Sequence, residues 1–322
     1  MTSLERRRVL VTGAGGFIGS HLVRLLLAEG ADVFAMSDSV SLVYPIRLAA
    51  CADAITVVEA NVNDRSSMDD VAATVKPDFV VHLAAFTHVG KSFRRVDENI
   101  QTNIQGTVNL LQALDGEYER FVYVGTSEIY GDVAVPFVED GPVNPISPYS
   151  VAKYAAERYC RMFHQAYGWP IVCLRPFNAY GPWQTADRII PEIILSGLRG
   201  RELRLTEGRQ TRDFTFVTDV AEGFLHALTA PGVEGEVFNI GSGEEVSMRD
   251  LTRLILELMG NPIRPAFGAL PERPTEIWRM FCDNAKARVH LDWKPSVPLA
   301  EGLTATVDWY REQFEARSPF VC

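Results

Sequence analysis

The feature of this sequence that most constrains its fold is a glycine-rich turn set between a short apolar strand and a helix. Residues 9–11 read Val-Leu-Val, which is typical of a buried strand, and residues 20–29 have a helical pattern. Between them, Gly13, Gly16 and Gly19 form the pattern G-x-x-G-x-x-G. Such a turn lets the backbone approach a pyrophosphate closely, and the helix N-terminus adds N–H donors and partial positive charge. The segment therefore predicts a dinucleotide-binding turn.

Strands and helices alternate regularly through the first half of the chain. Short apolar runs are followed by longer segments with helical periodicity. This alternation predicts a parallel sheet that is covered by helices on both faces. The expected strands are residues 9–11, 32–36, 55–58, 79–83, 121–125 and 171–174, and the expected helices are residues 20–29, 66–75, 99–114 and 149–167.

The pattern changes after Arg175, where prolines and glycines become denser. Helical patterns return at residues 220–228, 248–258 and 299–314, and a proline-rich stretch at 262–274 precedes the last of them. We therefore expect an α/β protein with a Rossmann-type doubly wound parallel sheet. A smaller, interleaved C-terminal α/β lobe is expected to follow it.

Composition excludes several classes of protein. The 322 residues are 47% hydrophobic and carry a formal net charge of −10 with scattered Lys and Arg, so no nucleic-acid partner is expected. No apolar stretch is long enough for a membrane span or a signal sequence, and no membrane partner is expected. The five cysteines lack C-x-x-C spacing and the histidines lack metal-ligand spacing, which predicts no metal site and a reducing, cytoplasmic location.

The residues after the second and third expected strands are candidates for binding the adenosine half of the dinucleotide. An acid at the end of the second strand of such a fold accepts the ribose hydroxyls, and Asp38 is the candidate. The nearest downstream arginine is Arg47, so the sequence favours NAD over NADP. Asn61 and Asp64 follow the third strand, and each either faces the adenine or caps the loop.

Tyr149 and Lys153 lie four residues apart at the start of an expected helix, behind the helix-starting pair Ser147-Pro148. At this spacing both side chains project from one face of the helix. A tyrosine has a reference pKa of about 10. We expect the Lys153 ammonium to lower the pKa of Tyr149, so that its phenolate takes a proton from a sugar hydroxyl.

Thr126, Ser127 and Glu128 follow the fifth expected strand, at the sheet edge where ligands of such folds bind. The Thr126 hydroxyl is expected to share a hydrogen bond with the substrate oxygen that Tyr149 deprotonates. Glu128 either abstracts a carbon-bound proton next to an oxidised carbon or serves only as a cap or an ion-pair partner.

Motifs spread over nearly the whole chain resemble those of the extended short-chain dehydrogenases/reductases, in the NAD-dependent epimerase/dehydratase group that modifies nucleotide sugars. The resemblance implies NAD as cofactor and a nucleotide diphosphate sugar as substrate. Residues 1–177 would form the NAD-binding Rossmann domain, to which 214–241 return, and residues 178–213 and 242–322 would form the nucleotide-sugar-binding lobe. The motifs are VTGAGGFIGSHL (11–22), HLAA (82–85), N-x-x-G-T (103–107), TSEIYG (126–131), YSVAK (149–153), RPFNAYGP (175–182), TRDFTFVTDV (211–220) and FNIGSG (238–243).

The resemblance also implies roles for single residues. Thr126, Tyr149 and Lys153 resemble the family's catalytic triad, to which Glu128 and Ser127 add candidates. The implied cofactor-binding residues are Gly13, Gly16, Phe17, Ile18, Gly19, Asp38, Asn61, Val62, Leu83, Ala84, Ala85, Tyr149 and Lys153.

Substrate binding is expected from five residues. Asn178 resembles the asparagine that approaches the sugar diphosphate, and Arg212 and Arg273 resemble arginines that hold the diphosphate or its ribose. His88 and Arg188 lie in segments expected to line the sugar pocket. Relatives commonly form homodimers through a four-helix bundle, here built from residues 99–114 and 149–167.

Glu128 favours an NDP-hexose 4,6-dehydratase, because that reaction needs a base for the C5 proton of a 4-keto sugar. Ser127 departs from the aspartate of glucose 4,6-dehydratases, and Ser37 stands where many relatives have the ribose aspartate. A 4-epimerase, which needs no such base, is the alternative. A UDP-glucuronate decarboxylase ranks lower, because no arginine acid is evident near Asp283. A non-catalytic NAD-binding sensor ranks last, because Tyr149 and Lys153 are both present.

Overall fold

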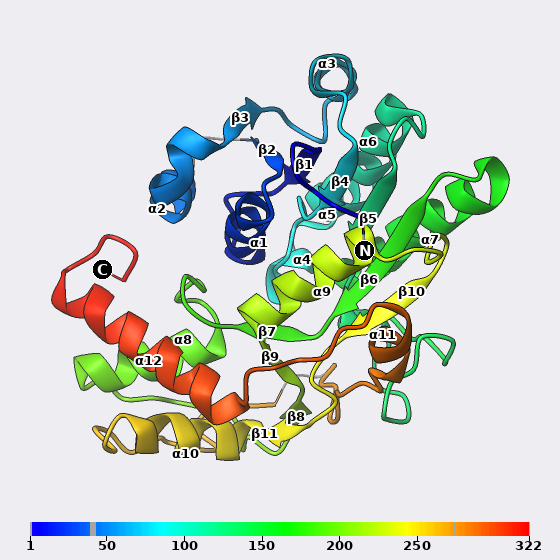
Figure 1. Ribbon diagram of the computed structural model, residues 1–322. Coiled ribbons are helices and arrows are strands. Elements are labelled where there is room, and N and C mark those ends of the chain that lie inside the picture. Colours follow the sequence, from blue (N-terminus) through cyan, green and yellow to red (C-terminus); the bar gives the residue numbers. More distant parts are fainter. Residues whose placement is uncertain (1, 39–42, 273–274, 322) are drawn as a thin grey trace.

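The structure, a computed structural model, describes residues 2–38, 43–272 and 275–321. Its centre is a seven-stranded sheet with strand order β3-β2-β1-β4-β5-β6-β10, in which all neighbours run parallel (Figure 1). The predicted doubly wound parallel sheet is therefore confirmed. The strands are β1 Arg8–Thr12, β2 Asp32–Ser37, β3 Thr56–Glu59, β4 Phe79–His82, β5 Arg120–Val124, β6 Ile171–Pro176 and β10 Val237–Ile240.

Strand β10 is not among the predicted strands. It has only four residues, and its polar Asn239 is completely buried, so the run lacks a clear apolar pattern. Tertiary contacts satisfy this amide, because its Nδ2 donates to the Phe137 carbonyl at 3.0 Å and its Oδ1 accepts from the Tyr130 hydroxyl at 2.7 Å. The strand is thus stabilised by partners that are distant in the sequence.

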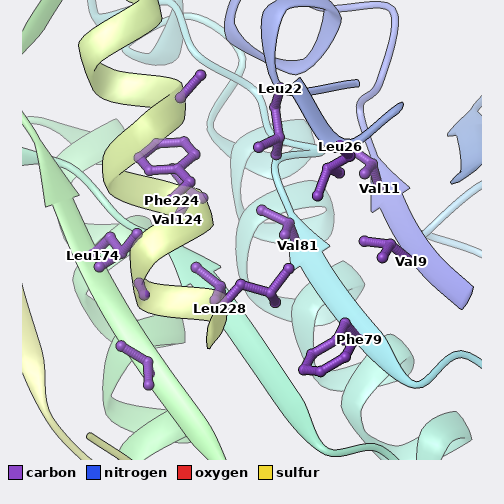
Figure 2. Packing of buried hydrophobic residues seen from close by; sticks show 14 of the residues in the cluster. Val9, Val11, Leu22, Leu26, Phe79, Val81, Val124, Leu174, Phe224 and Leu228 are labelled. Atoms are coloured by element: carbon purple, nitrogen blue, oxygen red, sulfur yellow. The ribbon is translucent and has the colours of Figure 1, made fainter. Parts of the chain in front are cut away.

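Alternate residues of each strand point to opposite faces of the sheet, and each face is covered by helices. On one face, Val9 and Val11 of β1 join a core with Leu22 of α1 (Phe17–Ala28) and Phe224 of α9 (Val217–Thr229), as Figure 2 shows. On the other face, Leu10 packs in a core formed with α3 (Arg65–Val75), α6 (Gly106–Leu114) and α7 (Pro148–Tyr167). This two-sided burial explains the continuous apolar character of the strands.

Apart from the two cores on the faces of the sheet, the chain has a separate core, called the second core from here on. The helices that form it lie below the carboxyl edge of the sheet (Figure 1). The second core is formed mainly by α8 (Ile189–Arg199), α10 (Met248–Leu258) and α12 (Leu299–Glu315), of which α8 was not predicted. Two small sheets join it to the rest, with β7 (Asn178–Tyr180) parallel to β9 (Phe214–Phe216) and β8 (Thr211–Arg212) antiparallel to β11 (Val246–Ser247). The shorter helices are α2 Val43–Leu48, α4 Val89–Ser92, α5 Val96–Ile100, α11 Ala285–His290 and the 3-10 helices Ala49–Ala54 and Ser127–Ile129.

The helix predicted over residues 99–114 is interrupted by a π-helical segment, Gln101–Gln105, between α5 and α6. Asn103 of this segment is buried and bonds both backbone groups of Phe86, accepting from its N–H at 2.9 Å and donating to its carbonyl at 3.1 Å. The segment therefore holds the loop that follows β4. Across the described residues, no helix is both long and apolar enough to span a membrane.

A buried histidine connects the glycine turn to the same loop. The Thr12 hydroxyl oxygen accepts the backbone N–H groups of Leu83 and Ala84 at 3.1 and 3.0 Å, and its O–H lies 2.8 Å from His82 Nδ1. His82 Nε2 lies 3.1 Å from the Thr107 hydroxyl, which donates to the Asn103 carbonyl. A neutral imidazole with its proton on Nε2 satisfies the whole chain of bonds.

Burial lowers the pKa of His82 to about 3, so the folded protein keeps this imidazole neutral. In the unfolded chain a histidine has a pKa of about 6.5. Between these values the unfolded state binds the extra proton, and the free energy of unfolding falls by about 1.4 kcal/mol per pH unit as the pH drops. We expect His82→Gln to remove this contribution, as measured by urea unfolding between pH 6.5 and 4.5.

The control for this experiment is Thr107→Val, which removes a partner of the imidazole but leaves the imidazole itself. It should lower stability at all pH values and keep the pH slope. An unchanged slope in His82→Gln would contradict the buried neutral state of His82.

Candidate active site

A cleft of about 900 Å³ lies along the carboxyl ends of the central strands and extends between the sheet and the second core. Its lining comes from the glycine turn, from the ends of β2, β4, β5 and β6, and from residues of the second core. Every predicted catalytic, cofactor-binding and substrate-binding residue that the structure describes lines this cleft. Arg273 lies outside the described residues.

The glycine turn brings α1 against β1 with no space for side chains. Gly13 has a φ of +67°, and a Cβ on it would lie 2.8 Å from the Ala84 nitrogen. A Cβ on Gly19 would lie 2.4 Å from the Gly13 carbonyl oxygen. Gly16 starts α1 without a side-chain cap, and the first turn of α1 contains no acid. This helix N-terminus is thus available to an anionic group such as the pyrophosphate of NAD.

The end of the cleft near β2 and β3 contains Asp38, Asn61 and an arginine that the sequence did not place there. Asp38 is exposed at the end of β2, and Asn61 accepts the Asn63 backbone N–H at 2.9 Å. Asp64 is not in the cleft lining and caps α3 through the Ser66 N–H at 3.0 Å, so capping is its role. Arg47 is buried in the cleft and donates to the Gly15 carbonyl at 3.0 Å.

The start of α7 orients the two central candidates. The Ser147 side chain caps the helix by accepting a hydrogen bond from the Ser150 N–H at 3.1 Å, and the Ser150 hydroxyl oxygen accepts one from the Ser147 N–H. Pro148 is the first residue of the helix. The predicted start of this helix is therefore confirmed. Tyr149 lies in the first turn of the helix and Lys153 one turn later, and both are buried and line the cleft.

Several groups around Tyr149 shift the pKa of its phenol. Burial raises the pKa of Tyr149 to about 12, a hydrogen bond with Thr126 and the charge of Arg188 lower it, and the Glu128 carboxylate raises it. Lys153 is not among the groups that shift it. Burial lowers the pKa of Lys153 itself to about 8, and its ammonium lies 4.5 Å from the centre of the Tyr123 ring. The pKa of Tyr149 is thus raised in the protein alone, because desolvation outweighs the favourable contacts, and the lowering of this pKa by Lys153 stays a prediction.

The Thr126–Ser127–Glu128 segment forms a short 3-10 turn at the end of β5. Thr126 caps it by accepting the Glu128 N–H at 3.2 Å, and Glu128 is half-buried in the cleft lining. The buried Ser127 hydroxyl donates to the Met280 thioether, with an O–S distance of 3.7 Å. Asn178 donates to the same sulfur at 3.8 Å. The Ser127 hydroxyl is thus hydrogen-bonded to Met280, whereas Thr126 and Glu128 both shift the pKa of Tyr149.

Two further groups of candidates lie toward the second core. Arg212 is held by the Glu276 carboxylate at 2.5 Å and by the Ile277 carbonyl at 2.7 Å. Glu276 also lines the cleft, and no local sequence pattern identified it as a site residue. An arginine fixed in this way presents a charged edge to an anion in the cleft.

The loops on the two sides of the cleft mouth meet through His88, Asp187 and Arg188. His88 Nε2 lies 3.8 Å from an Asp187 carboxylate oxygen, and Arg188 donates weakly to the Thr87 carbonyl at 3.4 Å. Burial, then the charges of Lys91 and Arg188, lower the pKa of His88, so His88 is neutral at pH 7. Asp187 was not among the predicted site residues.

Comparisons with known proteins agree with this geometry. The model of the NAD dependent epimerase/dehydratase family matches residues 9–241. The chain is 34% identical to a dTDP-glucose 4,6-dehydratase of Neisseria meningitidis, over 94% of this chain and 93% of the relative. It is 36% identical to a UDP-glucose 4-epimerase of Mycolicibacterium smegmatis, over 95% of this chain and 99% of the relative.

A solved structure is similar over a comparable length. It is a dTDP-glucose 4,6-dehydratase double mutant of Streptomyces venezuelae with NAD bound, with a TM-score of 0.87 and 31% sequence identity over 96% of this chain and 98% of that one. The chain belongs to the NAD-dependent epimerase/dehydratase family. This membership confirms the predicted class, an enzyme that uses NAD.

Proposed function

We propose that this protein is an NAD-dependent NDP-hexose 4,6-dehydratase that works through a 4-keto sugar. The observation that carries the proposal is the Glu128 carboxylate, which lines the cleft close enough to Tyr149 to raise the pKa of its phenol. A 4,6-dehydratase needs such a base next to the group that deprotonates the sugar hydroxyl. The similarity to the Neisseria dehydratase over nearly the whole chain supports the same reaction.

The glycine turn fits NAD, which would supply a hydride acceptor for the sugar carbon that is oxidised. The first turn of α1, with Phe17 and Ile18, would hold the pyrophosphate, and Asp38 would accept the adenosine ribose hydroxyls. Leu83, Ala84 and Ala85 would line the nicotinamide half, and Asn61 and Val62 the adenine half.

In the first step, Tyr149 would take the proton of the C4 hydroxyl while C4 gives up its hydride. Its pKa of about 12 in the protein alone means that the phenol is neutral at pH 7, so it needs additional stabilisation of its anion when the cleft is filled. Thr126 already lowers the pKa of Tyr149 through its hydrogen bond. Lys153, with a pKa of about 8, remains mainly cationic at pH 7 and would supply part of this stabilisation.

In the second step, Glu128 would remove the proton from C5, which the C4 carbonyl has made acidic. The C6 hydroxyl would leave as water, and Glu128, now protonated, would return this proton to it, because the Ser127 hydroxyl is bonded to Met280. C6 would then take back the hydride that left C4, and C5 would take a proton from solvent. The product is a 4-keto-6-deoxy sugar, with no net oxidation.

The nucleotide sugar would lie between the sheet and the second core. Asn178 and Arg212 would approach the diphosphate, and His88 and Arg188 would close over the sugar from the two loops that meet at the mouth of the cleft. We further propose the corresponding division into domains, with residues 1–177 and 214–241 binding NAD, and residues 178–213 and 242–322 binding the nucleotide sugar. Arg273 would belong to the second domain.

A 4-epimerase is the second candidate. It is favoured by the Ser127–Met280 contact, which leaves no separate acid beside Glu128 for the C6 hydroxyl, and by the similarity to the Mycolicibacterium epimerase. A uronate substrate fits less well, because its carboxylate would share the cleft with the carboxylates of Glu128 and Asp187.

Turnover in heavy water distinguishes the two candidates. A 4,6-dehydratase incorporates solvent deuterium at C5 and releases water, whereas an epimerase retains the original hydrogen at C5. We expect Glu128→Gln to lower turnover by about 10²–10⁴-fold, the usual contribution of a general base. The measurement is NMR of the products from a panel of NDP-hexoses. Product without deuterium at C5, or full activity of Glu128→Gln, would exclude the dehydratase.

We also propose a cytoplasmic homodimer. The free thiols of Cys160, Cys173 and Cys282 support a reducing compartment. Helices α5 and α7 contact each other and present large apolar side chains to solvent, as a four-helix bundle would require. These side chains, together with Phe93 just after α4, are 40–51% exposed: Phe93, Val96, Ile100, Val151, Tyr159 and Met162.

Light scattering tests the dimer. The wild type should have twice the 35.8 kDa mass of one chain, and the double variant Ile100→Glu, Tyr159→Glu should be monomeric, because four charges would be buried in the bundle. Val289→Glu, at a 76% exposed position of α11, is the control and should remain dimeric. A monomeric wild type, or a double variant that stays dimeric, would exclude this interface.

A further inference from the structure

Arg47 is a buried arginine that joins two parts of the cleft by bonds to backbone carbonyls. Its side chain donates to the Gly15 carbonyl at 3.0 Å and to the Trp183 carbonyl at 2.8 and 3.2 Å. Within the part of the chain that the structure describes, no carboxylate forms an ion pair with it. Burial of a cation without a counter-ion costs free energy, and here it lowers the pKa of Arg47 to about 10. The bonds of Arg47 to the two carbonyls have to offset this cost, which indicates that they hold the two segments together.

The two carbonyls belong to segments with different tasks. Gly15 lies in the glycine turn that would hold NAD, whereas Trp183 belongs to the loop of residues 181–188. This loop lines the cleft through Gln184, Asp187 and Arg188, which face the proposed sugar position. The loop is also tied to α1, because the Pro182 carbonyl lies 3.0 Å from His21 Nε2. Arg47 is therefore a direct contact between the cofactor side and the substrate side.

An aromatic cluster supports this contact from outside. The rings of Trp183, Trp309 and Phe320 lie with their centres 4.9–5.5 Å apart, and the Arg47 guanidinium lies 5.4 Å from the centre of the Phe320 ring. The C-terminal segment that carries Phe320 is held by a hydrogen bond from Arg199 to the Val321 carbonyl. In Figure 1 this red segment lies between α12 and α2. Trp183 itself has a left-handed φ of +70°, a conformation that is uncommon for residues other than glycine.

We propose that Arg47 is a positioning residue that couples the binding of NAD to the binding of the nucleotide sugar. By fixing the Trp183 carbonyl against the glycine turn, it keeps loop 181–188 in the conformation that Asp187 and Arg188 need to close the cleft. A ligand that orders one side of this contact thereby favours the ordered state of the other side. The inference rests on the proposed function, because it requires that both ligands bind in this cleft.

The side-chain chemistry explains why an arginine would be needed. The planar guanidinium has five N–H donors and can bridge two carbonyls while its face lies on an aromatic ring. A lysine keeps the charge but concentrates it on one nitrogen, so it can satisfy only one of the two segments well. A methionine fills a similar volume and has no donor. Substitution of Arg47 by Lys therefore keeps the positive charge but loses the bridge between the two carbonyls, whereas substitution by Met removes both.

Calorimetry of binding tests the coupling without relying on turnover. The dissociation constant of NAD⁺ is measured with and without saturating dTDP, and with UDP in parallel. In the wild type we expect the nucleoside diphosphate to tighten NAD⁺ binding by about 5–150-fold, the usual range of such coupling. In Arg47→Met this factor should fall to about 1, and in Arg47→Lys it should be intermediate.

Kinetics give a second readout. In Arg47→Met the KM for the nucleotide sugar should rise by about tenfold while kcat changes little, because Arg47 does not touch the reacting atoms. Phe320→Ala, which removes only the ring beneath the guanidinium, should show the same effects more weakly and serves if Arg47→Met does not fold. Arg65→Met removes an exposed arginine of α3 that pairs with Asp69 at 2.8 Å, and it should behave as the wild type.

The outcomes separate the inference from the proposed function. If wild-type protein binds NAD⁺ and a nucleoside diphosphate but Arg47→Met keeps the same coupling factor and KM, the inference is wrong and the proposed function stands. The inference is also wrong, and the proposed function still stands, if the nucleoside diphosphate does not change the affinity of the wild type for NAD⁺. If the wild type binds neither dTDP nor UDP, the proposed function fails and the inference fails with it.

Discussion

Burial of the Tyr149 phenol at the carboxyl edge of the sheet is the constraint on which the rest of the site depends. The Ser147–Ser150 capping box and Pro148 fix the first turn of α7, so that Tyr149 and Lys153 both face the cleft. Burial excludes water from the phenol, but it also raises the pKa of Tyr149 to about 12. The same burial therefore leaves little phenolate at neutral pH, and the surrounding groups have to stabilise the anion if Tyr149 is to act as the base.

The groups around this phenol shift its pKa in opposite directions. Arg188 and Thr126 lower the pKa of Tyr149, whereas Glu128 raises it. A carboxylate that works against the first proton transfer is costly unless it serves a later step. Removal of a C5 proton is such a step, which is why Glu128 favours a dehydratase over an epimerase. The charge of Arg188 acts on the phenol from loop 181–188, so the position of this loop affects the pKa of Tyr149 as well as the proposed closure of the cleft.

Much of this arrangement could be predicted from local sequence patterns, and the rest depends on contacts between distant segments. The glycine turn, the sheet strands through β6 and the start of α7 each have local signals. Strand β10 has none, because its buried Asn239 depends on Phe137 and Tyr130. Arg47 follows Asp38 by nine positions and was used only to favour NAD over NADP, yet folding places it on Gly15 and Trp183. The direction of the Tyr149 pKa shift could not be predicted either, because spacing along a helix says nothing about desolvation.

Carbon-13 NMR of protein labelled at tyrosine Cζ tests the central claim most directly, with Tyr149→Phe to assign the resonance. At pH 10 a tyrosine with the reference pKa of about 10 would be about half ionised. In the protein without ligands we expect Tyr149 to be still a neutral phenol at this pH, and we expect its pKa to fall when NAD⁺ and a nucleoside diphosphate fill the cleft. A Tyr149 signal that is already half ionised at pH 10 in the free protein, and unchanged by the ligands, would contradict this expectation.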